Sequence, residues 1–243
     1  EDYLLPKGAD VGFEPAQRVG REDVRWLQTR NFAQVTTMLS ADAGISPTRW
    51  QKAGYPDALR QKIGVVHEGI DTDFCRPDAD ARFTLPNGQV LRAGDRVVTY
   101  ASRHLEPYRG FPQFMRAAAL LARRDRLATF VVAGADGTAY GADPGNGGSW
   151  REVMLKETGI DPSRIHFVGT LSHDRLIQLF QVSAAHVYLT YPFVLSWSML
   201  EAMAAGVHLI GSDTAPVTEF VEHGRNGHLV PFFDVEPLVA AMQ

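Results

Sequence analysis

Apolar and polar positions alternate along most of the chain in segments of two lengths. Short apolar runs predict buried strands at residues 96–101, 128–133, 165–168, 186–189, 207–211 and 227–230. Longer segments with apolar positions at helical spacing predict helices at 111–123, 150–158, 173–182, 197–205, 216–222 and from 235 onward. Strands that alternate with helices of this length favour right-handed crossovers. They therefore predict an α/β fold with a doubly wound parallel sheet and helices on both faces.

The first 72 residues show a different pattern. Residues 1–20 have little periodicity and predict an irregular arm, and a helical pattern follows at 21–39. A short strand is then predicted at 43–46, a helix at 47–59 and a strand at 62–67. Such a segment closes the edge of a sheet but does not make a complete domain. The chain also begins without Met, so we expect it to be a fragment of a longer protein.

Composition narrows the class of protein. A chain of 243 residues with 45% apolar residues is long enough to bury a substantial core. The net charge is −4 and the basic residues are scattered, so we expect no nucleic-acid partner, and any phosphate must be held locally. No apolar run approaches the roughly 20 residues of a membrane span, and we expect a cytoplasmic protein.

The sequence offers little sign of a metal or of hydrolytic chemistry. The single cysteine, Cys75, has no partner at metal-ligand spacing, so we expect neither a disulfide framework nor a thiolate zinc site. The eight histidines include no helical i, i+4 pair. The chain lacks both a Gly-x-Ser-x-Gly nucleophile motif and a phosphate-loop lysine motif, which argues against a serine hydrolase and an ordinary kinase.

Three strand-to-helix junctions bring polar groups to the carboxyl edge of the predicted sheet, where the ligands of such sheets bind. In residues 102–110, Arg103 and Arg109 offer two guanidiniums to a diphosphate, or are simply solvated. In the second junction, Ser196 caps a helix whose first amides attract anions. Glu201, one turn further, suits a ligand diol, although an exposed carboxylate is the alternative.

The remaining two loops are weaker indications. The third junction, at residues 169–171, turns through a glycine and offers backbone groups to a base. The glycine-rich segment 134–149 follows another strand and is either a tolerant surface insertion or a mobile flap beside a ligand.

Four motifs in this order resemble a known family. They are SRHLEPYRG at 102–110, FVG at 167–169, EAMAAG at 201–206 and EFVEHGRNGHLV at 219–230. Together they resemble the donor-binding half of a retaining glycosyltransferase of family 4, which has the two-lobed GT-B fold. VVHEGID at 65–71 is similar to the family's Asn-Gly-Val-Asp crossover, with Glu68 in place of Asn.

The resemblance implies two domains and a set of site residues. Residues 1–72 would be the end of the acceptor lobe, and residues 73–243 a Rossmann-like domain that binds a nucleotide sugar. Arg103 and Arg109 stand at the family's diphosphate-binding positions, and Glu201 stands where the family has a ribose-binding glutamate. The amides of Ser196 and Trp197 would hold a phosphate. Besides Arg103, Arg109 and Glu201, the expected donor-binding residues are Gly169, Thr170, Leu171, Phe193, Val194, Leu195, Ser196 and Trp197.

One departure from the family pattern leaves alternatives open. Phe193 stands where the family has a first glutamate that contacts the donor sugar. The family implies sugar transfer with retention of anomeric configuration from a nucleoside-diphosphate sugar, without a cofactor or an obligatory metal. The acceptor would be a sugar, a lipid or another hydroxyl compound bound by the remainder of the other lobe, and the whole protein would act in the cytoplasm or at the cytoplasmic face of the membrane.

Two other functions fit the same motifs. One is a nucleotide-sugar epimerase of related fold, and the other is a nucleotide-binding module that has lost catalysis, for which Phe193 is the best argument. Under each of these interpretations we expect the fragment alone to be inactive in transfer.

Overall fold

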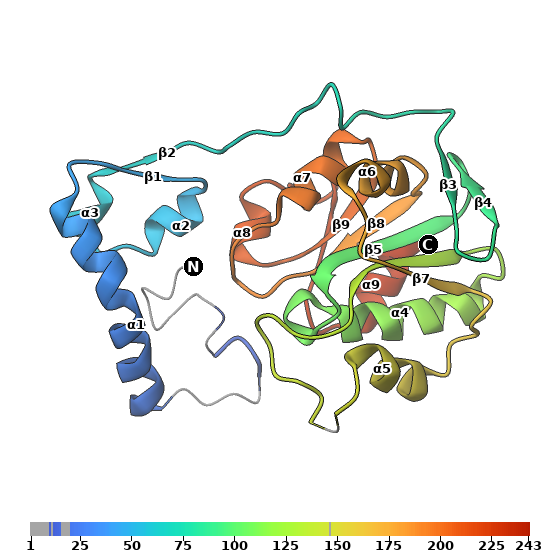
Figure 1. Ribbon diagram of the computed structural model, residues 1–243, viewed down its shortest axis with the longest axis horizontal. Helices are drawn as coiled ribbons and strands as arrows, with labels where there is room; N and C mark the ends of the chain where they lie inside the picture. The colour runs from blue at the N-terminus through green and yellow to red at the C-terminus, as the bar shows by residue number, and fades with distance from the viewer. Residues whose placement is uncertain (1–9, 11, 16–19, 146) are drawn as a thin grey trace. The chain divides into compact units, whose positions relative to one another are not determined.

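The computed structural model describes residues 10, 12–15, 20–145 and 147–243 (Figure 1). The chain forms two compact units. The first comprises residues up to 69 together with 191–195 and 214–220, and the second comprises 70–190, 196–213 and 221–243. Of the predicted irregular arm, residues 1–9, 11 and 16–19 lie outside the described residues.

The second unit is built on a six-stranded parallel sheet. Its strands are β5 (Val97–His104), β6 (Thr129–Ala135), β7 (Ile165–Gly169), β8 (Ala185–Tyr188), β9 (His208–Ser212) and β10 (His228–Val230). They lie side by side in the order β7-β6-β5-β8-β9-β10, and every neighbouring pair is parallel. This is the strand order of the Rossmann fold. The predicted doubly wound parallel sheet is therefore confirmed.

Helices cover both faces of this sheet (Figure 1). On one face α4 (Phe111–Arg124) packs against α5 (Trp150–Thr158) and α9 (Val235–Met242), and on the other lie α6 (His173–Gln181) and α7 (Trp197–Ala204). The sequence explains these helices: in α4, the apolar residues Phe111, Phe114, Met115, Ala118 and Leu121 recur at helical spacing, and all are buried. Each helix agrees with a predicted one to within one residue at the ends that were predicted.

A short antiparallel hairpin lies in the stretch 71–95, which reads as turns in the sequence. It consists of β3 (Arg82–Thr84) and β4 (Val90–Arg92). Its central residues Phe83 and Leu91 are buried in a cluster with Val97, Val131 and Leu179, so the hairpin closes the core between the sheet and α6. These strands were not predicted because each has only three residues and they lie among the turn residues Pro77, Pro86 and Gly88.

The first unit contains α1 (Arg21–Ser40), β1 (Gly44–Ser46), α2 (Arg49–Ala53), α3 (Asp57–Arg60), β2 (Ile63–Val65) and α8 (Ala215–Thr218). Strands β1 and β2 lie within the two strands predicted at 43–46 and 62–67, and they form a parallel pair with each other. The single helix predicted at 47–59 is wrong: it is divided between α2 and α3. Pro56 precedes α3, and a proline disfavours helical backbone at the residue before it.

The predicted helix at 216–222 is also too long, because α8 ends at Thr218. The Phe220 amide donates to the Val217 carbonyl three residues back, which is a turn rather than a continued α-helix. The Glu219 carboxylate accepts hydrogen bonds from the backbone amides of Arg49 and Trp50 at 2.7 and 2.9 Å, at the start of α2. Negative charge at the start of a helix is stabilising, so Glu219 acts as a cap for α2.

No helix among the described residues is both long enough and apolar enough to cross a lipid bilayer.

Candidate functional site

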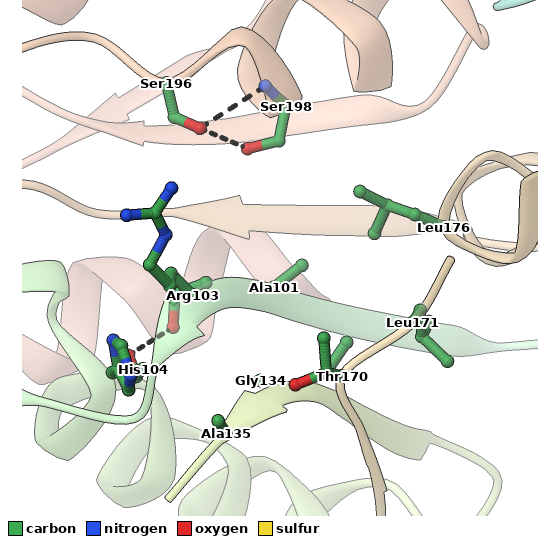
Figure 2. A pocket seen from close by; sticks show the side chains of 12 residues that line it. Ala101, Arg103, His104, Gly134, Ala135, Thr170, Leu171, Leu176, Ser196 and Ser198 are labelled. Carbon is green, nitrogen blue, oxygen red and sulfur yellow. Dashed lines mark hydrogen bonds between the residues drawn. The ribbon is translucent and has the colours of Figure 1, made fainter. Parts of the chain in front are cut away.

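A pocket of about 410 Å³ opens at the carboxyl ends of β5 and β6 (Figure 2). It belongs wholly to the second unit and includes the loop after β7 and the start of α7. It is lined by Ala101, Ser102, Arg103, His104, Ala133, Gly134, Ala135, Thr170, Leu171, Leu176, Ser196 and Ser198. Of the predicted site residues, Arg103, Thr170, Leu171 and Ser196 are therefore brought together.

Arg103 is an exposed guanidinium within this pocket. It lies at an irregularity near the end of β5, where the pairing with β6 shifts between Ala101 and His104. Figure 2 shows its side chain extending toward the side of the pocket formed by Ser196 and Ser198. Among the residues that the structure describes, none forms a hydrogen bond or ion pair with Arg103. Its charge is therefore available to an anion.

Gly134 lets the ends of β5 and β6 come close enough to form the pocket wall. Its φ is +150°, and a Cβ atom there would lie 2.6 Å from the Ser102 carbonyl oxygen and 2.9 Å from the Leu105 side chain. Both contacts are shorter than a Cβ atom makes unless its neighbours shift, so a side chain at this position would strain the fold. The glycine-rich loop thus begins with a residue that is required by packing.

Ser196 caps α7 as predicted, since its Oγ accepts a hydrogen bond from the Ser198 amide at 3.4 Å. Its own amide is used differently from the expectation: it donates to the Tyr188 hydroxyl at 2.8 Å. In this conformation the Ser196 amide is not available to a phosphate. The dipole of α7 still points its positive end toward the pocket, where Ser196 and Ser198 both lie.

Arg109 is placed quite differently from Arg103. It ends the 3-10 turn η1 (Pro107–Arg109), is half-buried, and is not among the pocket-lining residues. Its Nη1 donates to the Thr190 hydroxyl at 2.7 Å and lies 3.5 Å from the Tyr188 hydroxyl, while its carbonyl accepts from the Tyr100 hydroxyl at 3.0 Å. Burial raises the pKa of both tyrosines. These phenols therefore stay neutral, and the guanidinium is held in a polar network with Thr190 and Tyr188.

Glu201 lies one helical turn after the pocket residue Ser198. Its carboxylate is hydrogen-bonded to His173 Nε2 at 2.8 Å. The Glu201 side chain is only 13% exposed, against 56% for His173. Both residues come from loops or helices that border the pocket, because His173 begins α6 directly after the loop that contains Thr170 and Leu171.

The remaining predicted residues are less closely tied to the pocket. Gly169 ends β7 with a left-handed φ of +68°, and Trp197 is 57% exposed at the first position of α7. Phe193, Val194 and Leu195 belong to the first compact unit, where Phe193 and Leu195 are buried. Their participation in a donor site stays a prediction.

The structure also reveals a residue that the sequence did not point to. Glu106 is fully buried, and its Oε2 accepts hydrogen bonds from the amides of Ala139, Tyr140 and Gly141, each at 3.0 Å. The carboxylate thus fastens the glycine-rich loop to η1. No local pattern indicates this contact, because the partners lie more than 30 residues away in the chain.

Cys75 is close to two of these residues. Ligand atoms of Cys75, His173 and Glu201 all lie within 4.8 Å of one another. Burial, and then the carboxylates of Glu201 and Asp71, raise the pKa of the Cys75 thiol. The expectation that Cys75 lacks partners at metal-ligand spacing concerned separation along the chain, whereas in space His173 and Glu201 lie close to it. The three residues come from a turn and two helices that only the fold brings together.

A Rossmann-ordered sheet with a cationic pocket at the carboxyl ends of its central strands defines an α/β ligand-binding domain. Comparison with protein families specifies which one. Residues 95–243 match the family described as "Glycosyl transferases group 1", and residues 1–75 match the "Glycosyl transferase family 4 group". The chain therefore belongs to the group 1 glycosyltransferases and contains the C-terminal lobe of a GT-B fold, which confirms the resemblance stated from its motifs.

Individual proteins support the same assignment. D-inositol 3-phosphate glycosyltransferase of Nocardia farcinica is 27% identical over 179 residues, which cover 71% of this chain and 37% of that protein. Sucrose-phosphate synthase from Thermosynechococcus elongatus has a TM-score of 0.68 at 24% identity, over 95% of this chain and 53% of that one. Anabaena HepE in complex with UDP-glucose has a TM-score of 0.61 at 18% identity, over 88% and 58%. The chain thus spans between 37% and 53% of the length of the curated relatives that it matches.

Proposed function

We propose that the second unit binds the nucleoside diphosphate of a sugar nucleotide, and that the whole protein transfers the sugar to a hydroxyl acceptor with retention of anomeric configuration. The observation that carries this proposal is Arg103: an exposed guanidinium without a partner among the described residues, in a pocket at the carboxyl edge of a Rossmann-ordered sheet. A planar, permanently charged fork suits a diphosphate because it donates two parallel hydrogen bonds.

The pocket offers further groups for the parts of such a ligand. The positive end of the α7 dipole adds to the attraction that Arg103 exerts on phosphate. Glu201 would accept hydrogen bonds from the ribose hydroxyls, in exchange for the one it now accepts from His173. Thr170 and Leu171 line the pocket on the side of β7, and together with Gly169 they would contact the base.

Arg109 would act behind these groups. It holds Thr190 and approaches Tyr188, and the Tyr188 hydroxyl in turn engages the Ser196 amide at the start of α7. If the Tyr188 hydroxyl turns away when a ligand enters, the Ser196 amide and the Arg109 guanidinium both become available to the diphosphate. Positive charge placed where the leaving diphosphate gains negative charge lowers the barrier to cleavage of the glycosidic bond.

This chemistry asks for no obligatory metal, because arginine and helix amides would neutralise the leaving group. HepE, a similar fold, was solved with UDP-glucose, so UDP is the first nucleotide to test. In the same proposal residues 1–72 are the end of the acceptor lobe and residues 73–243 are the donor domain, so the fragment alone has no transfer activity.

The experiment is a thermal unfolding series with UDP, GDP, ADP and CMP, each with magnesium and with a chelator. A ligand at a hundred times its dissociation constant adds about 2.7 kcal/mol, which raises the midpoint by about 5 to 11 °C for a chain of this size. A shift with one diphosphate in the presence of the chelator supports the proposal and names the base. The absence of any shift, with isothermal titration also flat, would overturn it.

A second candidate, a nucleotide-binding module without transfer activity, is favoured by one observation: Phe193 occupies the position of the family's sugar-contacting glutamate, and it is buried. The full-length protein separates the candidates. Sugar transfer to an acceptor supports the transferase. An epimerised sugar nucleotide without acceptor indicates the epimerase, and unchanged donor that is nonetheless bound indicates the silent module.

A further inference from the structure

The Cys75–His173–Glu201 cluster combines the three side-chain types that zinc prefers. The thiol of Cys75, an imidazole nitrogen of His173 and a carboxylate oxygen of Glu201 lie within 4.8 Å of one another. From these observations we propose that the cluster is a binding site for a thiophilic divalent cation, with Zn²⁺ as its occupant. The site is distinct in chemistry from the phosphate contacts of Arg103, although it shares Glu201 with the proposed ribose contact.

Geometry favours this assignment. Zinc binds sulfur at about 2.3 Å and nitrogen or oxygen at about 2.0 to 2.2 Å in tetrahedral sites. Those bond lengths place the ligand atoms about 3.3 to 3.6 Å apart. The His173 nitrogen and the Glu201 oxygen, now 2.8 Å apart, must open by a few tenths of an ångström. The sulfur lies at most 4.8 Å from the other ligand atoms, so it must approach them by at most about 1.2 to 1.5 Å. Such movements lie within the reach of side-chain rotation.

The surrounding structure holds the three ligands in place. Cys75 is fixed by a turn in which its amide donates to the Asp71 carbonyl at 2.8 Å, while the Asp71 carboxylate accepts from the amides of Asp73 and Phe74 at 3.0 Å each. The ring of His173 packs against Phe74, with centroids 5.1 Å apart. Glu201 is part of α7, so its position is set by the helix backbone.

Charge also favours a divalent ion. A thiolate and a carboxylate together carry the two negative charges that neutralise Zn²⁺, and the neutral imidazole completes three ligands. On binding, the Cys75 thiol releases one proton to the solvent, and the proton on His173 Nε2 is given up to the solvent while another is taken up at Nδ1. The hydrogen bond between His173 and Glu201 is thereby exchanged for two bonds to the metal. Three protein ligands leave one tetrahedral position for water. The exposure of His173, 56%, gives the ion access from solvent.

Occupation of this site has a consequence that rests on the proposed function. Zinc bound to one Glu201 oxygen withdraws that oxygen from the ribose hydroxyls and leaves only the second oxygen to accept from them. Zinc would therefore weaken nucleotide binding, and the metal would act as an inhibitor of donor binding.

The metal is tested first, without nucleotide. Reduced, metal-free protein is titrated with Zn²⁺ by calorimetry, and with Co²⁺ by absorption spectroscopy, in which a thiolate ligand gives an intense charge-transfer band. We expect Cys75→Ser and His173→Gln each to weaken Zn²⁺ binding at least tenfold, and the band to vanish in Cys75→Ser. His173 is exposed, so its variant should fold even if the buried Cys75→Ser does not.

The matched control is a second histidine group. The ring centroid of His228 lies 4.8 Å from that of His223 and 5.3 Å from that of His208, so these histidines are the comparison group for zinc binding outside the proposed site. His228→Gln should leave zinc affinity within twofold of the parent. A loss confined to His228→Gln, or equal zinc affinity in the parent, Cys75→Ser and His173→Gln, or a cobalt complex without the thiolate band, would each overturn the proposal.

The competition is tested second, with UDP titrated in the presence and absence of zinc. We expect at least a fivefold loss of UDP affinity with zinc in the parent protein and less than a twofold change in Cys75→Ser, which also controls for zinc bound to UDP in solution. If zinc binds at the site and UDP affinity is unchanged by it, the competition is refuted. If UDP fails to bind the zinc-free protein, the proposed function fails, while the zinc measurements stand on their own.

Discussion

Replacement of Arg103 by alanine tests whether the pocket is built for an anion. The side chain is exposed and has no hydrogen-bonding or ionic partner among the described residues, so its removal should cost the fold little. Surface substitutions of this kind change the free energy of unfolding by about 0.5 kcal/mol or less. The variant should therefore unfold at nearly the same temperature as the parent protein, and any loss of binding is a loss of contacts with the ligand.

The size of that loss follows from the contacts that the guanidinium would make. A hydrogen bond to a charged group contributes about 1.5 to 3 kcal/mol. At about 1.4 kcal/mol per factor of ten, the affinity for a nucleoside diphosphate should fall by about 12-fold to about 140-fold. Arg103→Lys keeps the charge but loses the planar fork, so its affinity should lie between those of the parent and the alanine variant.

The assay is isothermal titration with UDP, or with whichever diphosphate the thermal series selects, at fixed salt and with a chelator present. Arg126→Ala is the matched control, because Arg126 is an exposed arginine in the connection between α4 and β6, at the opposite end of that strand from the pocket. It removes the same charge, and salt screens its long-range effect. Equal affinities in Arg103→Ala and Arg126→Ala would refute the assignment of Arg103 to the ligand.

Three further outcomes follow from the packing around the pocket. Gly134→Ala should lower the free energy of unfolding by about 1 to 3 kcal/mol in denaturant titration, because its Cβ would lie 2.6 Å from the Ser102 carbonyl; an unchanged midpoint would contradict this. Glu106→Gln should speed proteolytic cleavage within the glycine-rich loop severalfold, since the charge that accepts three loop amides is lost, and an unaltered cleavage pattern would argue against the anchor. Burial lowers the pKa of His186 to about 3, so the unfolded chain binds the extra proton between pH 6.5 and 3, and stability falls as pH decreases through that window. Between pH 7 and pH 5, this shift should lower the free energy of unfolding by about 2 kcal/mol. Denaturant unfolding of His186→Gln should show a pH dependence that is smaller by this amount. An equal pH dependence in the two proteins would contradict the low pKa of His186.

The amino-acid sequence by itself determined the sheet, most of its helices and the family. Strands such as β6, β8 and β9 are short runs whose burial is nearly continuous, and helices such as α4 repeat their apolar residues at helical spacing. Both patterns involve residues that are close together in the chain, so they can be recognised without knowledge of the fold. A helix start is also predictable where the sequence contains a capping motif. Ser149 and Glu152 are an example, because they form a capping box at the start of α5.

The tertiary structure decided which polar residues meet. Arg103 and Arg109 look equivalent in the sequence, yet one is exposed in the pocket and the other is held by Thr190 and Tyr188, which follow it by about 80 residues. The contacts of Glu106 with three loop amides, and the approach of His173 and Glu201 to Cys75, likewise join residues that are far apart in the chain. Hydrogen bonds and metal contacts act over a few ångströms in space, whereas the sequence records only separation along the chain. Which side chains come within that range depends on how the strands are ordered in the sheet.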